Sequence, residues 1–249
     1  MIEAVNLKKS FDGQGVLRGI NLHIARSELL VIMGKSGGGK SVLLKHIIGL
    51  MKPDSGSILI DGVDITRLEG REIDHVREKF GVLFQGGALF DSLSAFQNVA
   101  FPLREKTRLS KGEIREKVLH ALDDVGLRGI GKKYPAELSG GMKKRVALAR
   151  ALITEPEVVF FDEPTTGLDP IILNSIHRLI RSTHQRYGFT GVMVSHEIPE
   201  IFDVADRVAM LHDGVIVEVG QPQEIRQSSN PIVRQFITGS LEGPIEAVG

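Results

Sequence analysis

The fold is decided by residues 29–41, which read Leu29-Leu30-Val31-Ile32-Met33-Gly34-Lys35-Ser36-Gly37-Gly38-Gly39-Lys40-Ser41. The first five side chains are apolar, and a continuous apolar run that ends at a glycine is typical of a parallel strand buried on both faces. A helical pattern follows from Val42 to Ile48. The stretch is therefore predicted to lead from a buried strand, through a glycine-rich loop, into a helix.

The glycine-rich loop fits the pattern G-x-x-x-x-G-K-[ST] of a phosphate-binding loop. Its glycines let consecutive backbone N–H groups point at phosphate oxygens, and the helix that begins near Lys40 adds roughly half a positive charge at its N-terminus. Lys40 is predicted to contact the β- and γ-phosphates of a nucleotide, and the Ser41 hydroxyl to bind Mg²⁺. The alternative is a glycine-rich turn without a ligand, which the strand before the loop and the helix after it disfavour.

Further apolar runs of strand length occur at residues 158–161 and 192–194, with helix-length segments between them. This βαβ pattern predicts a parallel sheet with crossover helices. The first 30 residues instead alternate apolar and polar side chains around a predicted turn at Gly13 to Gly15, as in antiparallel strands with one solvated face. We expect an α/β P-loop NTPase core with a mainly parallel sheet, an N-terminal antiparallel β-subdomain and a helical insert.

We expect one domain that covers residues 1–249. The strand signal fades after Gln85, which predicts a helical subdomain over about residues 86–151. Within it, the sequence Ser110-Lys111-Gly112-Glu113 has the spacing of a capping box that opens a helix through Val125.

The last fifth of the chain is predicted to contain a hairpin and a tail. Residues 208–211 and 215–219 are strand-like and flank a His-Asp-Gly turn at 212–214. Residues from about 230 to 249 hold prolines and glycines and are expected to form a C-terminal tail.

The composition excludes several classes of function. The 31 basic and 31 acidic side chains give a net charge of zero, so no cationic field favours nucleic acid as a partner. The chain has no cysteine, which excludes disulfides and thiolate metal sites. No apolar run approaches the ~20 residues of a membrane-spanning helix, and the N-terminus lacks the pattern of a signal peptide. A cytoplasmic protein is expected.

Polar side chains follow two of the predicted buried strands. Asp162 and Glu163 come directly after residues 158–161, and His196 follows another apolar run. Asp162 is predicted to hold Mg²⁺, and Glu163 to polarise the water that attacks the γ-phosphate. His196 would lie at the carboxyl edge of the sheet, where α/β proteins bind ligands, and would hydrogen-bond the γ-phosphate. Taken singly these residues are often structural; beside a phosphate-binding loop they indicate catalysis.

A second phosphate-binding helix N-terminus is predicted at Leu138-Ser139-Gly140-Gly141-Met142. Ser139 is an N-cap followed by glycines, before an amphipathic helix with Val146 and Ala149 on its apolar side and residues 143–145 on its polar side. One nucleotide has one γ-phosphate. Two such sites in one chain therefore indicate a dimer in which each subunit completes the pocket of the other.

The motifs and their order resemble the ATP-binding-cassette (ABC) family over nearly the whole chain. The matching residues are Gln85 as the Q-loop glutamine, 138–142 as the signature, Asp162-Glu163 as Walker B, 167–169 as the D-loop and His196 as the switch histidine.

The resemblance implies the cofactors ATP and Mg²⁺ and a role for each site residue. It implies that Phe11 stacks on adenine and that the phosphates contact Gly34, Lys35, Ser36, Gly37, Gly38, Gly39, Lys40, Ser41 and Val42 in one subunit and Ser139, Gly140 and Gly141 in the other. It implies that Ser41, Gln85 and Asp162 hold the metal, and that Glu163, His196 and Gln85 act in catalysis.

The chain departs from the usual family pattern at a few positions. Met142 replaces the glutamine of the signature and cannot supply its amide hydrogen bonds. Lys35 stands where proline or asparagine is more common in the phosphate-binding loop, and Val42 where threonine is often found. Neither change in the loop removes a group that the chemistry requires.

Residues 84–93 and 98–105, together with the tail around 231–236, are similar to the ATPases of lipid transporters that work with MCE proteins. This resemblance implies a homodimer that drives an integral membrane permease to move phospholipid across the cell envelope. It also implies an MCE-domain lipid-binding protein as a partner and leaves room for a small regulatory subunit. The chain would then lie at the cytoplasmic face of the inner membrane, attached through the permease.

Two other functions remain open at this point. The chain could serve another class of ABC transporter, or it could be a non-transport ABC ATPase, such as one of iron–sulfur assembly. Ribosomal ABC factors usually carry two cassettes and chromosomal ones a long coiled coil, whereas this chain has one uninterrupted cassette.

Residues 86–104 are predicted to form the socket for a short helix of the permease. The segment runs directly from Gln85, and Ala88, Leu89, Phe90, Leu93 and Phe96 are apolar where the periodicity places them near the surface. The alternative is that these side chains pack the helical insert onto the sheet.

Overall fold

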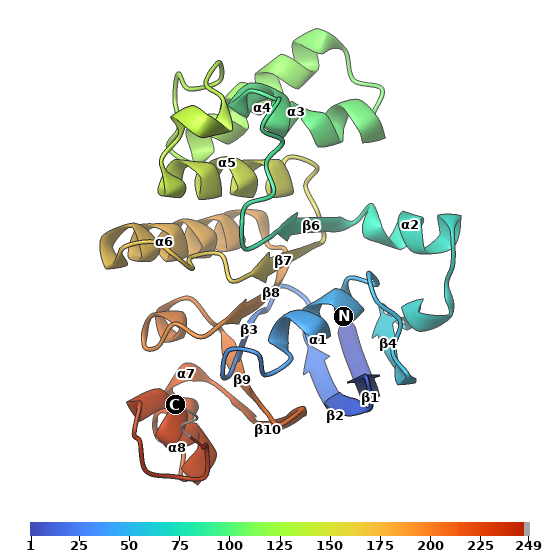
Figure 1. Cartoon of the computed structure of the whole chain (residues 1–249). Helices are drawn as coiled ribbons and strands as arrows, with labels where there is room; N and C mark the ends of the chain where they lie inside the picture. The colour runs from blue at the N-terminus through green and yellow to red at the C-terminus, as the bar shows by residue number, and fades with distance from the viewer. Residues whose placement is uncertain (247–249) are drawn as a thin grey trace. The chain divides into compact units, whose positions relative to one another are not determined.

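The computed structural model in Figure 1 describes residues 1–246 and contains two compact units. The first unit comprises Met1–Glu78 and Thr190–Gly249, and the second comprises Lys79–Phe189. The last three residues of the predicted tail, 247–249, lie outside the described residues.

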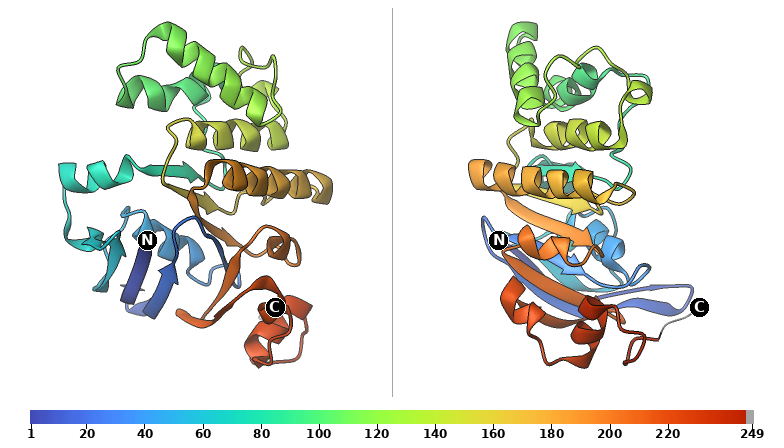
Figure 2. Two further views of the ribbon diagram at one scale, coloured as in Figure 1. Left: turned by 180° about the vertical axis from the view of Figure 1, so that it is seen from behind. Right: turned by 90° about the vertical axis from the view of Figure 1, so that its left-hand side faces the viewer.

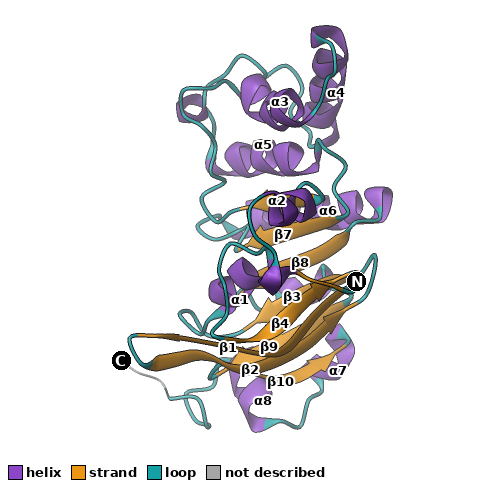
Figure 3. Cartoon of the chain, turned by 90° about the vertical axis from the view of Figure 1, so that its right-hand side faces the viewer, coloured by secondary structure: helices purple, strands orange, loops and turns teal. Residues whose placement is uncertain are grey.

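An antiparallel sheet with the strand order β2-β1-β4-β5 forms the N-terminal part of the first unit. Its strands are β1 (Ile2–Phe11), β2 (Gln14–Ile24), β4 (Ser55–Ile60) and β5 (Val63–Asp64), and β1 lies between β2 and β4 (Figure 3). The turn between β1 and β2 is Asp12-Gly13, rather than the predicted Gly13 to Gly15, because Gly15 already pairs with Ser10. Asp12 and Gly13 have φ values of 48° and 79°, as a two-residue hairpin turn requires.

Parallel strands form the second sheet region of this unit. The strand β3 (Leu29–Met33) pairs in parallel with both β8 (Thr190–Ser195) and β9 (Arg207–His212). The predicted hairpin is confirmed, because β10 (Val215–Gly220) pairs antiparallel with β9. Every residue of β3 is fully buried, as its continuous apolar sequence predicted.

Helices complete the first unit, and the described helices include none that is long and apolar enough to cross a membrane. The α-helices are α1 (Lys40–Ile47), α2 (Arg71–Arg77), α7 (Pro222–Arg226) and α8 (Pro231–Thr238), and the short 3₁₀ helices are η1 (Ile65–Arg67) and η3 (Glu200–Asp203). The segment predicted as a tail thus contains α8, which packs against α7, while α7 packs against β9 and β10 (Figure 2).

The second unit combines a parallel strand pair with a group of helices. Its elements are β6 (Phe80–Leu83), α3 (Ala95–Lys106), α4 (Lys111–Asp124), η2 (Pro135–Glu137), α5 (Gly140–Leu152), β7 (Val158–Asp162) and α6 (Pro170–Tyr187). The helices α3, α4 and α5 pack on one another. The predicted capping box is confirmed: the Ser110 hydroxyl accepts from the Glu113 N–H, and the Glu113 carboxylate accepts from the Ser110 N–H.

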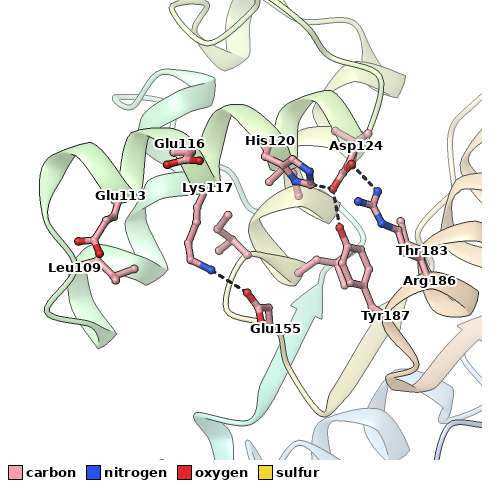
Figure 4. A pocket seen from close by; sticks show the side chains of 15 residues that line it. Leu109, Glu113, Glu116, Lys117, His120, Asp124, Glu155, Thr183, Arg186 and Tyr187 are labelled. Atoms are coloured by element: carbon pink, nitrogen blue, oxygen red, sulfur yellow. Dashed lines mark hydrogen bonds and ion pairs between the residues drawn. The ribbon is translucent and has the colours of Figure 1, made fainter.

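The ends of α4 and α6 are joined through the carboxylate of Asp124, whose side chain is 14% exposed (Figure 4). Arg186 Nη1 and the Tyr187 hydroxyl each donate to it at 2.6 Å, and His120 Nδ1 lies 3.1 Å away. This cluster lines a cavity of about 450 Å³ between α4, α5 and α6. Burial raises the pKa of Tyr187 to about 12, and the hydrogen bond to Asp124 acts in the same direction.

Tyr187→Phe should change the alkaline stability of the chain. The pKa of Tyr187 is raised in the folded state, so its contribution to stability is fully present below its ordinary pKa of 10.0 and is lost as the pH rises toward about 12. The variant should unfold at a lower temperature near neutral pH and show a shallower decline in Tm between about pH 10 and about pH 12. Thermal unfolding across this range checks both effects.

Tyr134→Phe, which removes the other tyrosine of the chain, is the matched control. In a pH titration followed by tyrosinate absorbance, the control should retain the transition near the raised pKa of Tyr187, and Tyr187→Phe should lack it. A late transition that persists in Tyr187→Phe would contradict the assignment.

Candidate functional site

The predicted site residues divide between the two units. The first unit holds Phe11, residues 34–42 and His196, and the second holds Gln85, residues 139–141 and residues 162–163.

In the first unit, strand register brings the phosphate-binding loop and the switch histidine to one edge. Met33 at the end of β3 is paired with Ser195 at the end of β8. Gly34 and His196 are the next residues of these neighbouring parallel strands, so both leave the same sheet edge. His196 is exposed there. The two predicted site elements of this unit are therefore neighbours.

The loop between β3 and α1 is held by the side chain of Lys40, which is 4% exposed. Its ammonium donates to the carbonyls of Gly34 at 2.9 Å and Lys35 at 3.0 Å. A backbone bond from Gly38 to the Lys35 carbonyl, at 3.0 Å, closes the turn. Lys40 thus fixes the loop from inside.

The start of α1 suits an anion. Its N-cap is Gly39, with a φ of 93°, and no described side chain caps the helix. Backbone N–H groups of the first turn remain without a helical partner, and they carry the positive end of the helix dipole. Ser41 and Val42 lie half-buried in this first turn. The arrangement can cradle phosphate oxygens.

The hairpin that carries Phe11 borders the same loop. A Cβ at Gly39 would lie 3.1 Å from Val16 Cγ1 on β2, so β2 approaches the loop closely. Phe11 itself is 40% exposed, and the Lys9 ammonium lies 5.5 Å from its ring centroid. An exposed aromatic ring in this place can stack on a planar base.

In the second unit, the register of two parallel strands again brings polar residues to one sheet edge. Leu83 of β6 pairs with Phe161 of β7, so Gln85 and Glu163 lie just beyond neighbouring strand ends. The Gln85 amide nitrogen donates to Glu163 Oε2 at 3.1 Å, and the Thr166 hydroxyl donates to the same oxygen at 3.1 Å. The structure therefore brings the two predicted catalytic side chains of this unit into contact.

Glu163 has an unusual backbone conformation, with a φ of 45°. A non-glycine residue held there carries a conformational cost, and such residues cluster at functional sites. The hydrogen bonds to its carboxylate fix the side chain as well. The strand end thus presents an oriented carboxylate.

The signature segment begins α5 as predicted. The Ser139 hydroxyl accepts from the Met142 N–H at 3.3 Å and caps the helix. A Cβ at Gly141 would lie 2.7 Å from Ile172 Cγ2, so a glycine is needed where α5 and α6 approach. Asp169 of the predicted D-loop has a structural role, because its carboxylate caps α6.

Lys144 corrects one prediction from the sequence. It was assigned to the polar side of α5, but it is 6% exposed, and its ammonium donates to the backbone carbonyl of Gln85. A buried ammonium needs a strong acceptor, and the strand-end loop supplies one. Nothing local in the sequence separates Lys144 from its neighbours Lys143 and Arg145.

Two further residues that the sequence did not single out hold the segment after Gln85. Arg150 donates to the carbonyls of Gly87 and Ala88, each at 2.7 Å, and burial lowers its pKa. Asn98 is fully buried; its oxygen accepts from the Phe90 N–H at 2.8 Å, and its amide donates to the carbonyl of Leu93 at 2.9 Å. Residues 87–93 are therefore a braced loop.

Exposed aromatic rings lie on this braced loop and on α3. Phe90 is 44% exposed and Phe101 38% exposed, with ring centroids 4.9 Å apart. Ala88 is exposed, while Leu89, Leu93 and Phe96 are half-buried. Phe101 extends the apolar surface that the sequence predicted.

The predicted metal ligands Ser41, Asp162 and Gln85 would bind through a hydroxyl, a carboxylate and an amide oxygen. Mg²⁺ prefers oxygen ligands of this kind. The Gln85 amide nitrogen is directed at Glu163, which leaves its oxygen as the group for a cation. The donor set fits the metal.

Comparisons with known proteins agree with this fold. Residues 17–166 match the ABC transporter family. MlaF, the ATP-binding protein of the intermembrane phospholipid transport system of Haemophilus influenzae, is 42% identical over 245 residues, covering 98% of this chain and 93% of that protein. The probable ribonucleotide transport ATP-binding protein mkl of Mycobacterium leprae is 43% identical over 244 residues, covering 98% and 70%.

Solved structures give the same result. The dimeric post-hydrolysis structure of the ATP-binding cassette MJ0796, bound to ADP and Pi, matches with a TM-score of 0.82 and 33% identity over 89% of this chain and 99% of that one. The structure of cbiO1 from Clostridium perfringens, part of the ABC transporter complex cbiONQ, matches with a TM-score of 0.84 and 34% identity over 94% and 93%. The predicted fold class is confirmed, and the chain belongs to the ABC transporter family as an ATPase subunit.

Proposed function

We propose that this chain is the ATPase of a phospholipid transporter and that it works as a homodimer with two MgATP molecules between its subunits. The observation that carries the proposal is the hydrogen bond between Gln85 and Glu163 at the end of β7. It presents a carboxylate, in contact with a possible metal ligand, where the family motifs predict the γ-phosphate. The chain would act as one domain over residues 1–249.

Each catalytic side chain has one task in this proposal. Glu163 accepts the proton of the attacking water, and its contact with Gln85 orients its carboxylate. His196 hydrogen-bonds the γ-phosphate. Lys40 and the first turn of α1 bind the phosphate oxygens, while Phe11 stacks on the base. Ser41, Asp162 and Gln85 would hold Mg²⁺, which would supply positive charge to the phosphates.

Glu163→Gln should retain ATP binding and lose most turnover. The amide cannot accept the proton of water, whereas the phosphate-binding loop is untouched, so kcat should fall by about a hundredfold to ten-thousandfold. Steady-state ATPase assays and titration with a fluorescent ATP analogue measure the two quantities.

The matched control is Glu157→Gln, which removes the carboxylate of an exposed ion pair with Lys79 just before β7. It should keep wild-type turnover. Wild-type turnover in Glu163→Gln would refute the catalytic assignment.

A homodimer explains why one chain has two helix N-termini suited to phosphate. The α1 terminus follows the phosphate-binding loop, and the α5 terminus carries the exposed Ser139 and Gly140. In the proposed dimer, α5 of one subunit faces the γ-phosphate held by α1 of the other. The dimeric state of the related ATP-binding cassette MJ0796 supports this arrangement.

Mixed dimers test the shared site. Lys40→Ala removes a phosphate contact, and Ser139→Asp retains a good N-cap while adding a charge that repels phosphate. Each variant should be inactive by itself. A mixture should recover about a quarter of the wild-type ATPase activity, since half of the dimers are mixed and each has one intact site.

Ser139→Asn introduces a neutral N-cap of the same size as aspartate. It is the control for the added charge and should retain more activity than Ser139→Asp. Thermal unfolding checks that all variants fold. A mixture with no more activity than its parents, formed from variants shown to exchange subunits, would contradict the shared-site proposal.

The braced loop and its aromatic rings are proposed as the docking site of an integral membrane permease. Bonds from Arg150 and Asn98 hold the backbone of residues 87–93 in place, so the exposed ring of Phe90 is fixed beside that of Phe101 on α3. A rigid aromatic surface binds a partner at low entropic cost. Its direct connection to Gln85 would carry the nucleotide state to the permease.

Phospholipid is the proposed substrate because the similarity to MlaF of Haemophilus influenzae spans nearly the full length of both proteins. The name of mkl of Mycobacterium leprae makes ribonucleotide the second candidate. With phospholipid, the partners would include an MCE-domain lipid-binding protein and a small regulatory subunit. The chain would sit at the cytoplasmic face of the inner membrane, attached through the permease.

Phe90→Glu should separate the chain from its membrane partner without unfolding it. Phe90 is already 44% exposed, so a charge there costs the isolated subunit little, whereas loss of a buried interface anchor weakens binding by about thirtyfold. Leu89→Glu and Phe101→Glu should have the same effect. Co-purification in mild detergent and transfer of labelled phospholipid between vesicles measure it.

Leu119→Glu, at a 49% exposed leucine on α4, is the matched control and should leave binding and transport unchanged. Wild-type permease binding in Phe90→Glu would refute the docking site. Transfer of ribonucleotide in place of phospholipid would refute the proposed substrate.

A further inference from the structure

The segment after α8 folds back onto that helix. Gln235, which is 7% exposed, accepts from the Ile245 N–H at 2.6 Å and donates to the Ile245 carbonyl at 2.9 Å. Its amide also lies 3.3 Å from the Ser240 carbonyl. One side chain thus replaces a strand partner for Ile245 and closes residues 240–245 into a loop.

Gly243 allows the loop to close. Its φ is 150°, and a Cβ there would lie 2.3 Å from Gln235 Oε1 and 2.5 Å from Gln235 Cδ. A side chain at this position would displace either the glutamine or the loop. The geometry therefore depends on Gln235 and Gly243 together.

The closed loop places Glu246 beside the phosphate-binding loop. The Lys35 ammonium donates to the Glu246 carbonyl at 3.1 Å. A cavity of about 550 Å³ lies at this junction; it is lined by Lys35, Ser36, Gly37 and Gly38, by residues 211–213 at the end of β9, and by residues 244–246. This volume is in the range of small-ligand sites, about 300–1,000 Å³.

We propose that residues 243–246 form one wall of the nucleotide pocket at its phosphate end, and that Gln235 is a positioning residue for nucleotide binding. The inference rests on the proposed function, since it takes the phosphate-binding loop as the nucleotide site. It adds a part of the chain 211 residues away from Lys35, which the loop motif itself does not include.

Lys35 is the physical link between the wall and the ligand. A lysine side chain that is free in solvent samples many rotamers, and ordering it on binding costs free energy. The Glu246 carbonyl already restrains the ammonium at the rim of the cavity, so less of that cost remains when an anion binds. Pro244 and Ile245 also cover one side of the cavity and reduce its contact with water, which strengthens attraction between charges.

In this proposal the wall acts on the ground state and the transition state alike, because residues 243–246 only shape the pocket and supply no group that acts in hydrolysis. Loss of uniform binding raises KM and leaves kcat unchanged. This pattern separates the wall from the catalytic carboxylate, whose loss lowers kcat.

Gln235→Met keeps the bulk of the side chain and removes its hydrogen bonds to Ile245. In the full-length chain, the Kd for a fluorescent ATP analogue and the KM for ATP should each rise about fivefold, as expected for one lost positioning bond. The kcat at saturating ATP should stay within about twofold of the wild type. Gln223→Met, at an exposed glutamine of α7, is the matched control and should bind as the wild type does.

Gly243→Ala displaces the loop from the opposite side and should give the same rise in KM. If Gln235→Met does not fold, Gly243→Ala tests the proposal in its place. Thermal unfolding shows whether each variant is folded. The rise in Kd caused by Gln235→Met should also depend on Lys35. In a Lys35→Met background, Gln235→Met should weaken binding by less than about twofold, because coupled residues are not additive.

Wild-type Kd and KM in folded Gln235→Met and Gly243→Ala would overturn the proposal, as would tighter binding or higher kcat, which would mean that the wall obstructs the site. Equal effects of Gln235→Met with and without Lys35 would overturn it too. Absence of nucleotide binding by the wild-type chain would instead refute the proposed function.

Discussion

A strand buried on both faces can carry polar groups only where it ends. The five residues of β3 are fully buried, and an unpaired charge among them would cost several kcal/mol. The chain therefore places its polar groups at the carboxyl ends of the parallel strands, where backbone groups also need partners. Because Met33 pairs with Ser195 and Leu83 with Phe161, these ends coincide within each unit, and residues far apart in sequence become neighbours.

Single side chains hold the backbone of the two functional loops in place. Lys40 braces the phosphate-binding loop through carbonyls of that loop, and Asn98 and Arg150 brace the segment after Gln85 in the same way. In each case one side chain satisfies several backbone groups that regular structure leaves without partners. Glycines and exposed rings on these loops can then keep one conformation without being buried themselves.

The parts of the structure that local chemistry determines could be predicted from the sequence. The apolar run of β3, the capping box at Ser110 and the β9–β10 hairpin depend on neighbouring residues, and each was predicted correctly. The burial of Lys144 could not be predicted, because its acceptor is 59 residues away. The same holds for Arg150, whose acceptors at Gly87 and Ala88 are 63 and 62 residues away.

The α-helix at the C-terminal end was also missed, because its prolines and glycines suggested a tail, whereas Pro231 begins α8 and Gly239 ends it. Both residues suit these positions at the ends of a helix as well as they suit a loop. The contact of Gln85 with Glu163 was not predicted, because it depends on the pairing of β6 with β7. The catalytic roles of Glu163 and His196 and the binding of Mg²⁺ remain predictions.

The bond from Lys144 to the Gln85 carbonyl connects α5 to the loop that follows β6. Lys144 lies in the first turns of the helix, close to Ser139, and a helix transmits displacement along its axis with little compression because its backbone bonds are short and numerous. A movement of the Gln85 peptide must either break a buried, charge-assisted bond or pull the signature end of α5 with it. The connection between these two loops therefore runs through basic side chains of α5, Lys144 near its start and Arg150 near its end.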